Sequence, residues 1–326
     1  MKLTQLRLIA VLIAMFATSP ALAAKLPVAG PMPSLSGADA WINSAPLSTA
    51  DLKGKVVLVD FWTYTCINWR RTMPWLRAWA QKYKDQGLVV IGVHTPEFSF
   101  EKDLDNVRRN AKEQRVDYPI AVDGRYAIWN AFDNHYWPAL YFIDAQGRIR
   151  HQQFGEGDYG QLELVIQQLL TEAGHNSFDR SPVSVDAQGA EVAADWKNLG
   201  TAETYLGSAR RDEGSAAPRL DGDWSVRRES VVSKKANAKV RYRFHARDVH
   251  LVMGPATRGT SVRFRVLIDG QPPGASHGID LDNTGQGTVD QPRMYQLIRQ
   301  PGPIVDRQIE IEFLDPGAEV FSFTFG

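Results

Sequence analysis

The chain of 326 residues contains a single cysteine, Cys66, and the residues around it are of types that can support thiol chemistry. The segment KVVLVDFWTYTCINWRRTMPWLRAW, residues 55–79, has a short apolar run and a Thr-rich turn before Cys66, and apolar residues then return at helical spacing. This pattern predicts a strand, a turn and a helix that starts at the thiol. Backbone N–H groups and the helix dipole favour a thiolate there, and Arg70 and Arg71 follow within one turn. We therefore expect a lowered pKa for Cys66.

The spacing around Cys66 resembles that of thioredoxin. Asp60 lies six residues before the cysteine, Trp62 lies four before it and Pro74 lies eight after it. In the thioredoxin family the motif continues as C-x-x-C, but in this chain Trp69 stands at the fourth position. Because no other cysteine is present, Cys66 cannot close an intramolecular disulfide.

The first residues predict a secretory signal peptide over residues 1–23. Lys2 and Arg7 precede an apolar run over 8–17 that is too short to cross a bilayer, and an Ala-Leu-Ala site ends the segment. A single cysteine in an oxidising compartment is a free thiol that needs an explanation. We expect a secreted, periplasmic protein that is not embedded in the membrane.

Charge argues against two classes of partner. Lysine and arginine together number 37, as do aspartate and glutamate. Loss of the predicted signal peptide leaves 35 basic against 37 acidic residues, which gives no attraction to nucleic acid or anionic membranes. The seven histidines form no H-x-x-x-H pair and the cysteine has no partner at zinc spacing, so we expect no metal and no cofactor. His94 and Glu97 follow an apolar strand and either edge the active-site face or cap its loop.

Residues 48–173 alternate between strand and helix patterns, whereas residues 24–47 are rich in Pro, Ser, Gly and Ala and predict an irregular lead-in. After the Cys66 helix we expect strands over 88–93 and 118–123, helices over 101–114 and 126–132, a strand over 137–144 with its hairpin partner over 148–154, and a closing helix over 162–173. Such an order predicts the mixed sheet flanked by helices of a thioredoxin fold.

A proline opens the predicted strand over 137–144, and the chain before it is longer than in the shortest thioredoxins. An extra helix and strand at this point resembles the secreted TlpA and AhpC/TSA branch of the family. In that branch the proline is cis and lies beside the reactive cysteine. The resemblance therefore implies that Pro138, with Trp137 before it, belongs to the site.

After residue 174 the pattern changes. Residues 175–200 are rich in Ser, Asp, Gly, Ala and Asn and predict a linker between a first domain over 24–174 and a second over 201–326. In the second domain apolar and charged residues alternate, as in VRYRF, VRFRVLI and IEIEF. Repeated half-buried strands with Gly, Pro and Asp turns predict an antiparallel β-sandwich.

Several phrases, namely WTYTCIN, GVHTPEF, FGEGDY, TYLGSAR, YRFHARDVHLVMGP and FTFG, resemble the extracytoplasmic part of DipZ-type proteins. In those proteins a thioredoxin-like domain precedes a jelly-roll domain that is similar to carbohydrate-binding modules. They also have a membrane electron-transfer domain, which we expect this chain to lack, so the resemblance implies an electron donor in trans. It further implies a glycan ligand for the second domain, where the candidate stacking faces are Trp196, Trp224, Tyr205 and Tyr295.

The residues permit thiol-disulfide exchange through one nucleophile. The chain has no second cysteine that could resolve a mixed disulfide at Cys66. An external thiol must therefore resolve it. The partners are then client protein thiols and disulfides or a low-molecular-weight thiol, and Asp60 is a buried carboxylate that tunes the site. The alternative is a binding or scaffold protein whose redox site has decayed, with Trp69 filling the vacated space.

A third alternative is a one-cysteine peroxidase. Thr63 precedes Cys66 by three residues, as in the peroxiredoxin P-x-x-x-T-x-x-C motif, but Val59 stands at the position of its proline. In this alternative Arg70 or Arg71 would polarise a peroxide.

Overall fold

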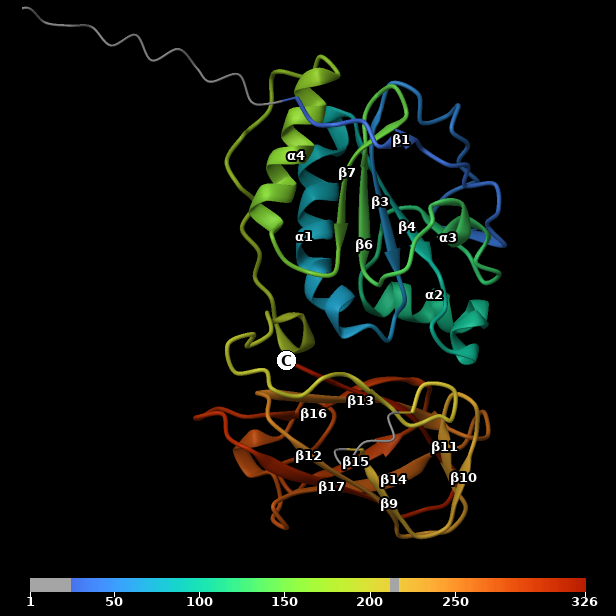
Figure 1. Ribbon diagram of the computed structural model, residues 1–326, viewed down its shortest axis with the longest axis vertical. Coiled ribbons are helices and arrows are strands. Elements are labelled where there is room, and N and C mark those ends of the chain that lie inside the picture. Colours follow the sequence, from blue (N-terminus) through green and yellow to red (C-terminus); the bar gives the residue numbers. More distant parts are fainter. Residues whose placement is uncertain (1–24, 212–216) are drawn as a thin grey trace, which may run out of the picture.

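The computed structural model describes residues 25–211 and 217–326, so the predicted signal peptide lies outside the described residues. These residues form an α/β domain and, below it in Figure 1, a domain of antiparallel sheets. Within the described ranges, no helix combines the length and apolar character needed to cross a membrane.

A seven-stranded mixed sheet forms the centre of the first domain. Its central strand, β3 (Val56–Trp62), pairs in parallel with β4 (Leu88–His94) and antiparallel with β6 (Ala139–Ile143). The remaining strands are β1 (Gly30–Pro31), β2 (Ala40–Ile42), β5 (Ile120–Val122) and β7 (Arg148–Phe154), in the spatial order β1-β7-β6-β3-β4-β5-β2. β3 is buried along its whole length, as its apolar sequence, interrupted only by Asp60, predicts for a strand covered on both faces.

Helices cover both faces of this sheet (Figure 1). Residues of α1 (Ile67–Tyr83), α2 (Leu104–Glu113) and α4 (Tyr159–Glu172) share one core, whereas α3 (Ala127–Ala131) packs into a second core. Side chains of β3 alternate between the two cores. The predicted thioredoxin-like α/β arrangement is confirmed.

Two segments differ from the prediction. The irregular lead-in contains β1 and β2, which pair with β7 and β5 and so occupy the two sheet edges, where unpaired backbone groups would otherwise be exposed. The helix expected over 101–114 is divided into a 3-10 turn, η2 (Ser99–Lys102), and α2. Asp103 separates them because its side chain accepts hydrogen bonds from the backbone of Asp105 and Asn106 and caps α2.

The second domain is an antiparallel β-sandwich, as predicted. One sheet has the order β10-β11-β18-β13-β16 with β8 paired to β18, and the other has the order β15-β14-β17-β12-β9. The strands are β8 (Thr204–Tyr205), β9 (Arg219–Asp221), β10 (Trp224–Val226), β11 (Val231–Ser233), β12 (Ala238–Phe244), β13 (Asp248–Pro255), β14 (Val262–Ile268), β15 (Gln286–Val289), β16 (Arg293–Arg299), β17 (Arg307–Phe313) and β18 (Ala318–Phe325). Apolar side chains of both sheets meet in one core between them.

The segment between α4 and β8 runs down the first domain to the sandwich and contains one 3-10 turn, η3 (Gly189–Glu191) (Figure 1). Both predicted boundaries, 174 and 200, fall within this irregular segment. The short turns η1 (Lys84–Gln86) and η4 (Gly274–Ser276) complete the described elements.

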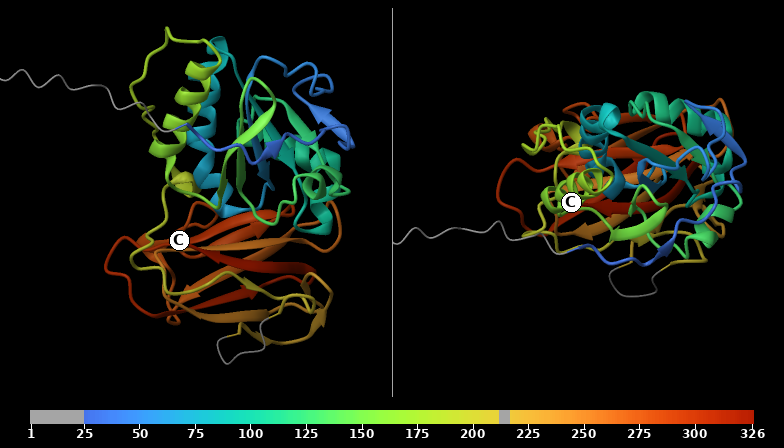
Figure 2. Two further views of the ribbon diagram at one scale, coloured as in Figure 1. Left: turned by 45° about the horizontal axis from the view of Figure 1, so that its top comes forward. Right: turned by 90° about the horizontal axis from the view of Figure 1, so that it is seen from above.

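The two domains meet at the start of α1. Ile67 and Phe98 of the first domain form a small apolar cluster with Val252, Met294 and Phe321 of the sandwich. Figure 2 shows from a second direction that strands of the sandwich lie against the end of the α/β domain. The sandwich therefore becomes part of the surroundings of Cys66.

Candidate active site

Cys66 is the N-cap residue of α1, which confirms the prediction that the thiol stands at a helix start. Its backbone N–H donates to the Thr63 carbonyl at 3.2 Å. The thiol contacts the carbonyl oxygen of Trp137 at 3.8 Å, and the Trp137–Pro138 peptide bond is cis. The fold thus brings together the thiol and the proline loop that the sequence predicted as parts of one site.

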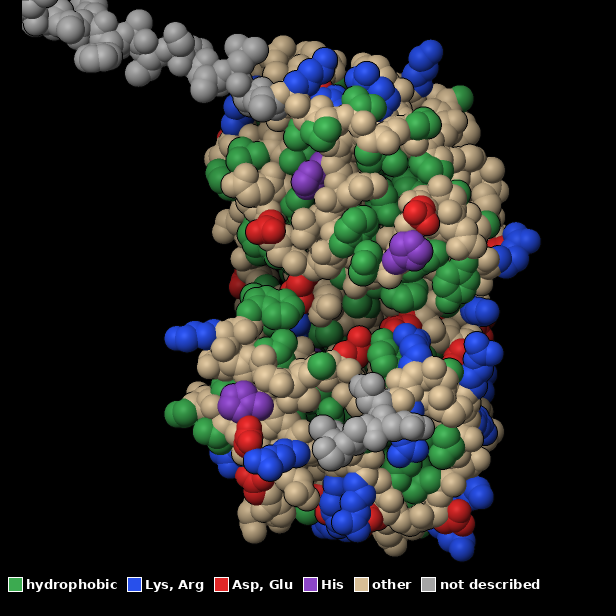
Figure 3. Space-filling model, in the orientation of Figure 1, with side chains coloured by type: hydrophobic (Ala, Val, Ile, Leu, Met, Phe, Trp, Pro, Cys, Tyr) green, Lys and Arg blue, Asp and Glu red, His purple; other side chains and the backbone are tan. Residues whose placement is uncertain are grey.

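The half-buried thiol lines a hollow of about 410 Å³ between the two domains, which we call the thiol cleft. The first domain contributes Cys66, Glu97, His135, Tyr136 and Trp137, and the other wall includes Trp196, Glu203, Tyr205 and Arg210. Figure 3 shows the groove between the domains on this face, with acidic and basic side chains next to hydrophobic ones. A hollow of this size matches the volumes of small-molecule sites.

Charged groups from both domains meet in the thiol cleft. Glu97, which follows β4, accepts hydrogen bonds from the Tyr205 hydroxyl at 2.6 Å and from Arg210 at 2.8 Å. The Arg210 guanidinium lies 4.0 Å from the centre of the Tyr205 ring. Sequence reasoning included Glu97 as an edge residue but missed Glu203 and Arg210, because no local motif connects them with a cysteine more than a hundred residues earlier.

The expected lowering of the Cys66 pKa is wrong. Burial raises the pKa of the thiol, and the nearby carboxylates of Glu97 and Glu203 raise it further, whereas the backbone N–H groups of Trp69 and Asn68 act in the opposite direction. A helix terminus contributes about 0.3–1 kcal/mol, whereas burial of a titratable group shifts its pKa by up to about 3–5 units. Desolvation and negative charge therefore outweigh the helix start, and the neutral thiol is favoured.

The two arginines that follow Cys66 serve the domain junction instead of the thiol. Arg71 forms an ion pair with Glu156 at 3.1 Å and donates to the Phe325 carbonyl at 3.2 Å. Burial and the positive charge of Arg293 lower the pKa of Arg70, whose side chain does not line the thiol cleft. The expectation that this pair supports the thiolate is not met.

Native Cys66 is expected to react with iodoacetamide with an apparent pKa above the free-thiol value of about 8.5. The direction follows from burial and from the two carboxylates of the cleft. Alkylation rates measured across pH on the native protein, and on the same chain unfolded in urea, give the two midpoints directly. A native midpoint below the unfolded one would contradict this assignment.

Trp69 fills the place of a second cysteine and is fully buried. Its indole ring stacks on Trp62 with ring centres 4.1 Å apart, and its N–H donates to Asp60 at 2.9 Å. Asp60 also accepts from the Tyr118 hydroxyl at 3.3 Å, and burial raises the pKa of its carboxyl to about 7. Asp60 is thus bound to the residue that replaces the second thiol.

Some of the other predicted residues lie away from the thiol cleft, and the candidate sugar-stacking residues range from buried to exposed. Thr63 is fully buried and lies outside the lining of the cleft. His94 is enclosed by aromatic rings, and burial lowers its pKa to about 3, so it is a neutral core residue. Among the candidate sugar-stacking residues, Tyr295 is in the sandwich core, Trp224 is half-buried and Tyr205 binds Glu97, whereas Trp196 is 58% exposed at the cleft.

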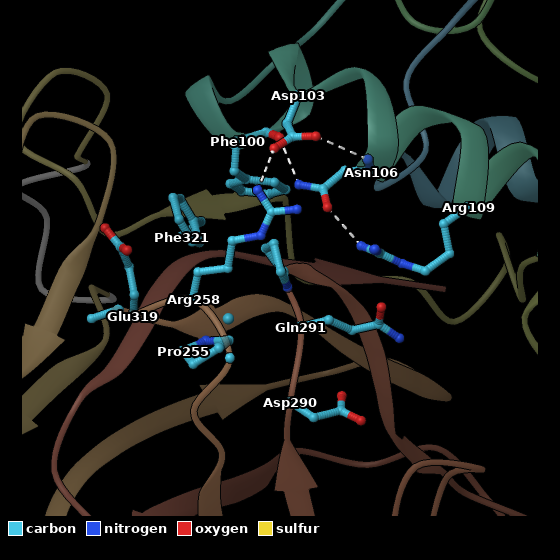
Figure 4. Close-up of a pocket in the computed structure, with 14 residues that line it drawn as sticks. Phe100, Asp103, Asn106, Arg109, Pro255, Arg258, Asp290, Gln291, Glu319 and Phe321 are labelled. Atoms are coloured by element: carbon cyan, nitrogen blue, oxygen red, sulfur yellow. Dashed lines mark hydrogen bonds and ion pairs between the residues drawn. The ribbon is translucent and has the colours of Figure 1, made fainter.

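A second hollow of about 480 Å³ lies between α2 and the loops of the sandwich (Figure 4). Asp103 and Arg258 form an ion pair across it at 3.1 Å, and Arg109 donates to Asn106 at 2.7 Å. The residues predicted as catalytic or supporting lie outside its lining. The thiol cleft is therefore the candidate site.

Both domains of the chain match known protein families. Residues 28–152 match the AhpC/TSA family, and residues 214–326 match the thioredoxin-like C-terminal domain. The second match extends over most of the β-sandwich, including all strands from β9 onward.

Individual relatives agree with these families. Protein DipZ of Mycobacterium bovis is 36% identical over 93% of this chain, which spans 44% of that protein. Thiol-disulfide oxidoreductase YkuV of Bacillus subtilis is 34% identical and matches 44% of this chain and 95% of its own length. A solution structure of a thioredoxin-like protein in the oxidised form, 35% identical, covers 44% of this chain and 96% of that one with a TM-score of 0.41. The chain therefore belongs to the AhpC/TSA family, carries a thioredoxin-like C-terminal domain, and has thiol-disulfide oxidoreductases among its relatives.

Proposed function

We propose that this protein carries out thiol-disulfide exchange in the periplasm with Cys66 as its one nucleophile. The observation that supports this most directly is the position of the thiol. Cys66 is the N-cap residue of α1, and its thiol lies against the loop of Pro138 and lines a cleft. The relatives named as thiol-disulfide oxidoreductases support the same class of reaction. The periplasmic location rests on the N-terminal segment of the sequence.

The exchange proceeds in two displacements. The Cys66 thiolate attacks one sulfur of a disulfide, so that a new bond joins Sγ to that sulfur while the old bond breaks and the other half leaves as a thiolate. Because Trp69 replaces the second cysteine, an external thiolate then attacks the mixed disulfide, forms a new disulfide and returns Cys66 to the thiol. Electrons enter through this external thiol, which is the donor in trans.

Asp60 and Trp69 have a supporting role in this proposal. Their hydrogen bond at 2.9 Å keeps the indole ring packed on Trp62 behind the helix start. The Oδ2 atom of Asp60 accepts from both Trp69 and Tyr118, whereas its buried Oδ1 has no hydrogen-bond partner among the described residues. Asp60 therefore positions the residues beneath the site, where no second thiol is present to give it a proton. The raised pKa of Cys66 implies that exchange accelerates as the pH rises above neutrality.

The activity test uses reduction of bis-hydroxyethyl disulfide by glutathione. The wild-type protein is expected to accelerate release of mercaptoethanol, and Cys66→Ser, which keeps the size of the side chain, is expected to lose all acceleration. The mixed disulfide at Cys66 is detectable by intact mass. Equal rates for the two proteins would overturn the proposal and favour a binding protein.

Of the two alternative functions, a binding or scaffold protein has structural support and a peroxidase does not. A binding or scaffold protein, with a client protein or a glycan as partner, is favoured by the exposed ring of Trp196 and by the packing of Trp69 onto Asp60. A peroxidase is not proposed, because neither Arg70 nor Arg71 lines the cleft and Thr63 is buried outside it.

A further inference from the structure

The thiol cleft has more acidic than basic groups around the sulfur. Glu97 and Glu203 both act on the Cys66 thiol through their negative charge. Arg210 forms an ion pair with Glu97 at 2.8 Å, so it offsets one of the two carboxylates. At the rim, His135 lies 3.3 Å from Asp133, which does not add a net positive charge to the cleft. Burial and the charge of Glu97 raise the pKa of Glu203 to about 7, so above neutral pH a ligand that approaches the sulfur meets an excess of negative charge.

Exposed aromatic side chains stand on both walls of the thiol cleft. Trp196 is 58% exposed and Tyr136 is 53% exposed, and both line the thiol cleft. The Tyr136 ring packs on Phe154 with ring centres 5.0 Å apart, and more than half of each of the two side chains stays open to a ligand. The face of an indole or phenol ring carries negative potential and attracts ammonium and guanidinium groups. The aromatic rings and the carboxylates thus favour the same kind of ligand by independent interactions.

We infer that the thiol cleft selects disulfides that carry a positive charge within a few atoms of the sulfur. This inference rests on the proposed exchange activity and specifies its substrate class. An aminothiol disulfide and a lysine-flanked cystine of an extended peptide share the required chemistry. A negatively charged disulfide is disfavoured because both carboxylates repel it.

The bound cation also changes the nucleophile. Burial keeps the thiol in its neutral form and the charges of Glu97 and Glu203 add to this effect, so an ammonium group placed between the carboxylates and the sulfur offsets their part of it. The Cys66 thiolate then forms with the substrate in place, attacks the nearer sulfur and expels the other half of the disulfide as a thiolate. The thiol proton leaves to solvent. The raised pKa of Cys66 thereby contributes to substrate selection, because a disulfide without a positive charge meets a thiol that stays neutral and unreactive.

The test compares three disulfides of similar length: cystamine, which is positive, bis-hydroxyethyl disulfide, which is neutral, and dithiodipropionate, which is negative. The rate of mixed-disulfide formation at Cys66 is measured by intact mass at low salt. Each rate is divided by the rate of the same disulfide with the chain unfolded in urea, which removes differences in intrinsic reactivity. We expect the normalised rates to fall from cystamine to dithiodipropionate by about tenfold or more.

Variants and salt locate the origin of the preference. Glu203→Gln and Trp196→Ala are each expected to reduce the normalised ratio severalfold, whereas Asp223→Asn, at an exposed acid outside the cleft, leaves it unchanged. Salt is expected to reduce the preference in the wild type, which gives a second readout without mutation. A disulfide of a lysine-flanked cysteine peptide distinguishes a small aminothiol substrate from a peptide substrate. It reacts as fast as cystamine only if the cleft admits a polypeptide.

The outcomes separate this inference from the proposed function. If all three disulfides react through native Cys66 with equal normalised rates, or if dithiodipropionate reacts fastest, the inferred selectivity is overturned while the exchange activity stands. If none reacts until the chain is unfolded, the proposed function fails and the inference fails with it.

Discussion

Replacement of Asp60 by asparagine is expected to stabilise the folded protein by up to about 4 kcal/mol near pH 8 and by almost nothing near pH 4. In the folded chain burial raises the pKa of Asp60 to about 7. The folded state therefore holds a proton that the unfolded state releases near pH 4. Ionisation costs stability as the pH rises from about 4 to about 7, and the full cost remains above that range. Asparagine cannot ionise and keeps an oxygen acceptor for Trp69.

Urea denaturation of both proteins across this pH range measures the difference, in which the contributions of other titrating groups cancel. Trp69→Phe serves as the matched variant. It removes the indole hydrogen bond that lowers the pKa of Asp60, so the loss of stability is expected to continue to a higher pH and to become larger in total. Parallel pH profiles for wild type and Asp60→Asn would show that Asp60 does not titrate in this range.

Replacement of Arg71 by methionine is expected to destabilise the protein by about 3–5 kcal/mol, because it leaves the carboxylate of Glu156 buried without its cation. The two side chains are 1% and 5% exposed and lie 3.1 Å apart. Arg71 also donates to the Phe325 carbonyl, so the same change removes a contact between the domains. Urea denaturation measures the loss, and faster alkylation of Cys66 reports any opening of the cleft.

A double substitution distinguishes the buried charge from lost packing. Arg71→Met combined with Glu156→Gln is expected to recover much of the stability, because no uncompensated charge remains. Arg258→Met, which removes the exposed ion pair with Asp103 at the same domain junction, is expected to cost less than about 1 kcal/mol. A loss at Arg71 as small as that at Arg258 would show that the pair with Glu156 is not desolvated.

Much of the fold follows from local patterns. The apolar run of β3 and the helical spacing after Cys66 place the thiol at the start of α1, because both depend on neighbours within a few residues. The proline that opens β6 and the alternation in β12 and β17 likewise identify their elements from sequence. The short edge strands β1 and β2 could not be predicted, since their pairing depends on a sheet edge made by distant segments.

The sequence by itself determined that this protein has one thiol, with no internal partner, at the start of a helix in a thioredoxin-like domain. The tertiary structure decided what surrounds that thiol. Glu203, Arg210 and Trp196 reach the thiol cleft from beyond the first domain, whereas Arg71 pairs with Glu156 at the domain junction and Arg70 does not line the cleft. A pKa depends on burial and on charges within a few ångströms in space, and these are set by how the two domains pack, which no spacing along the chain encodes.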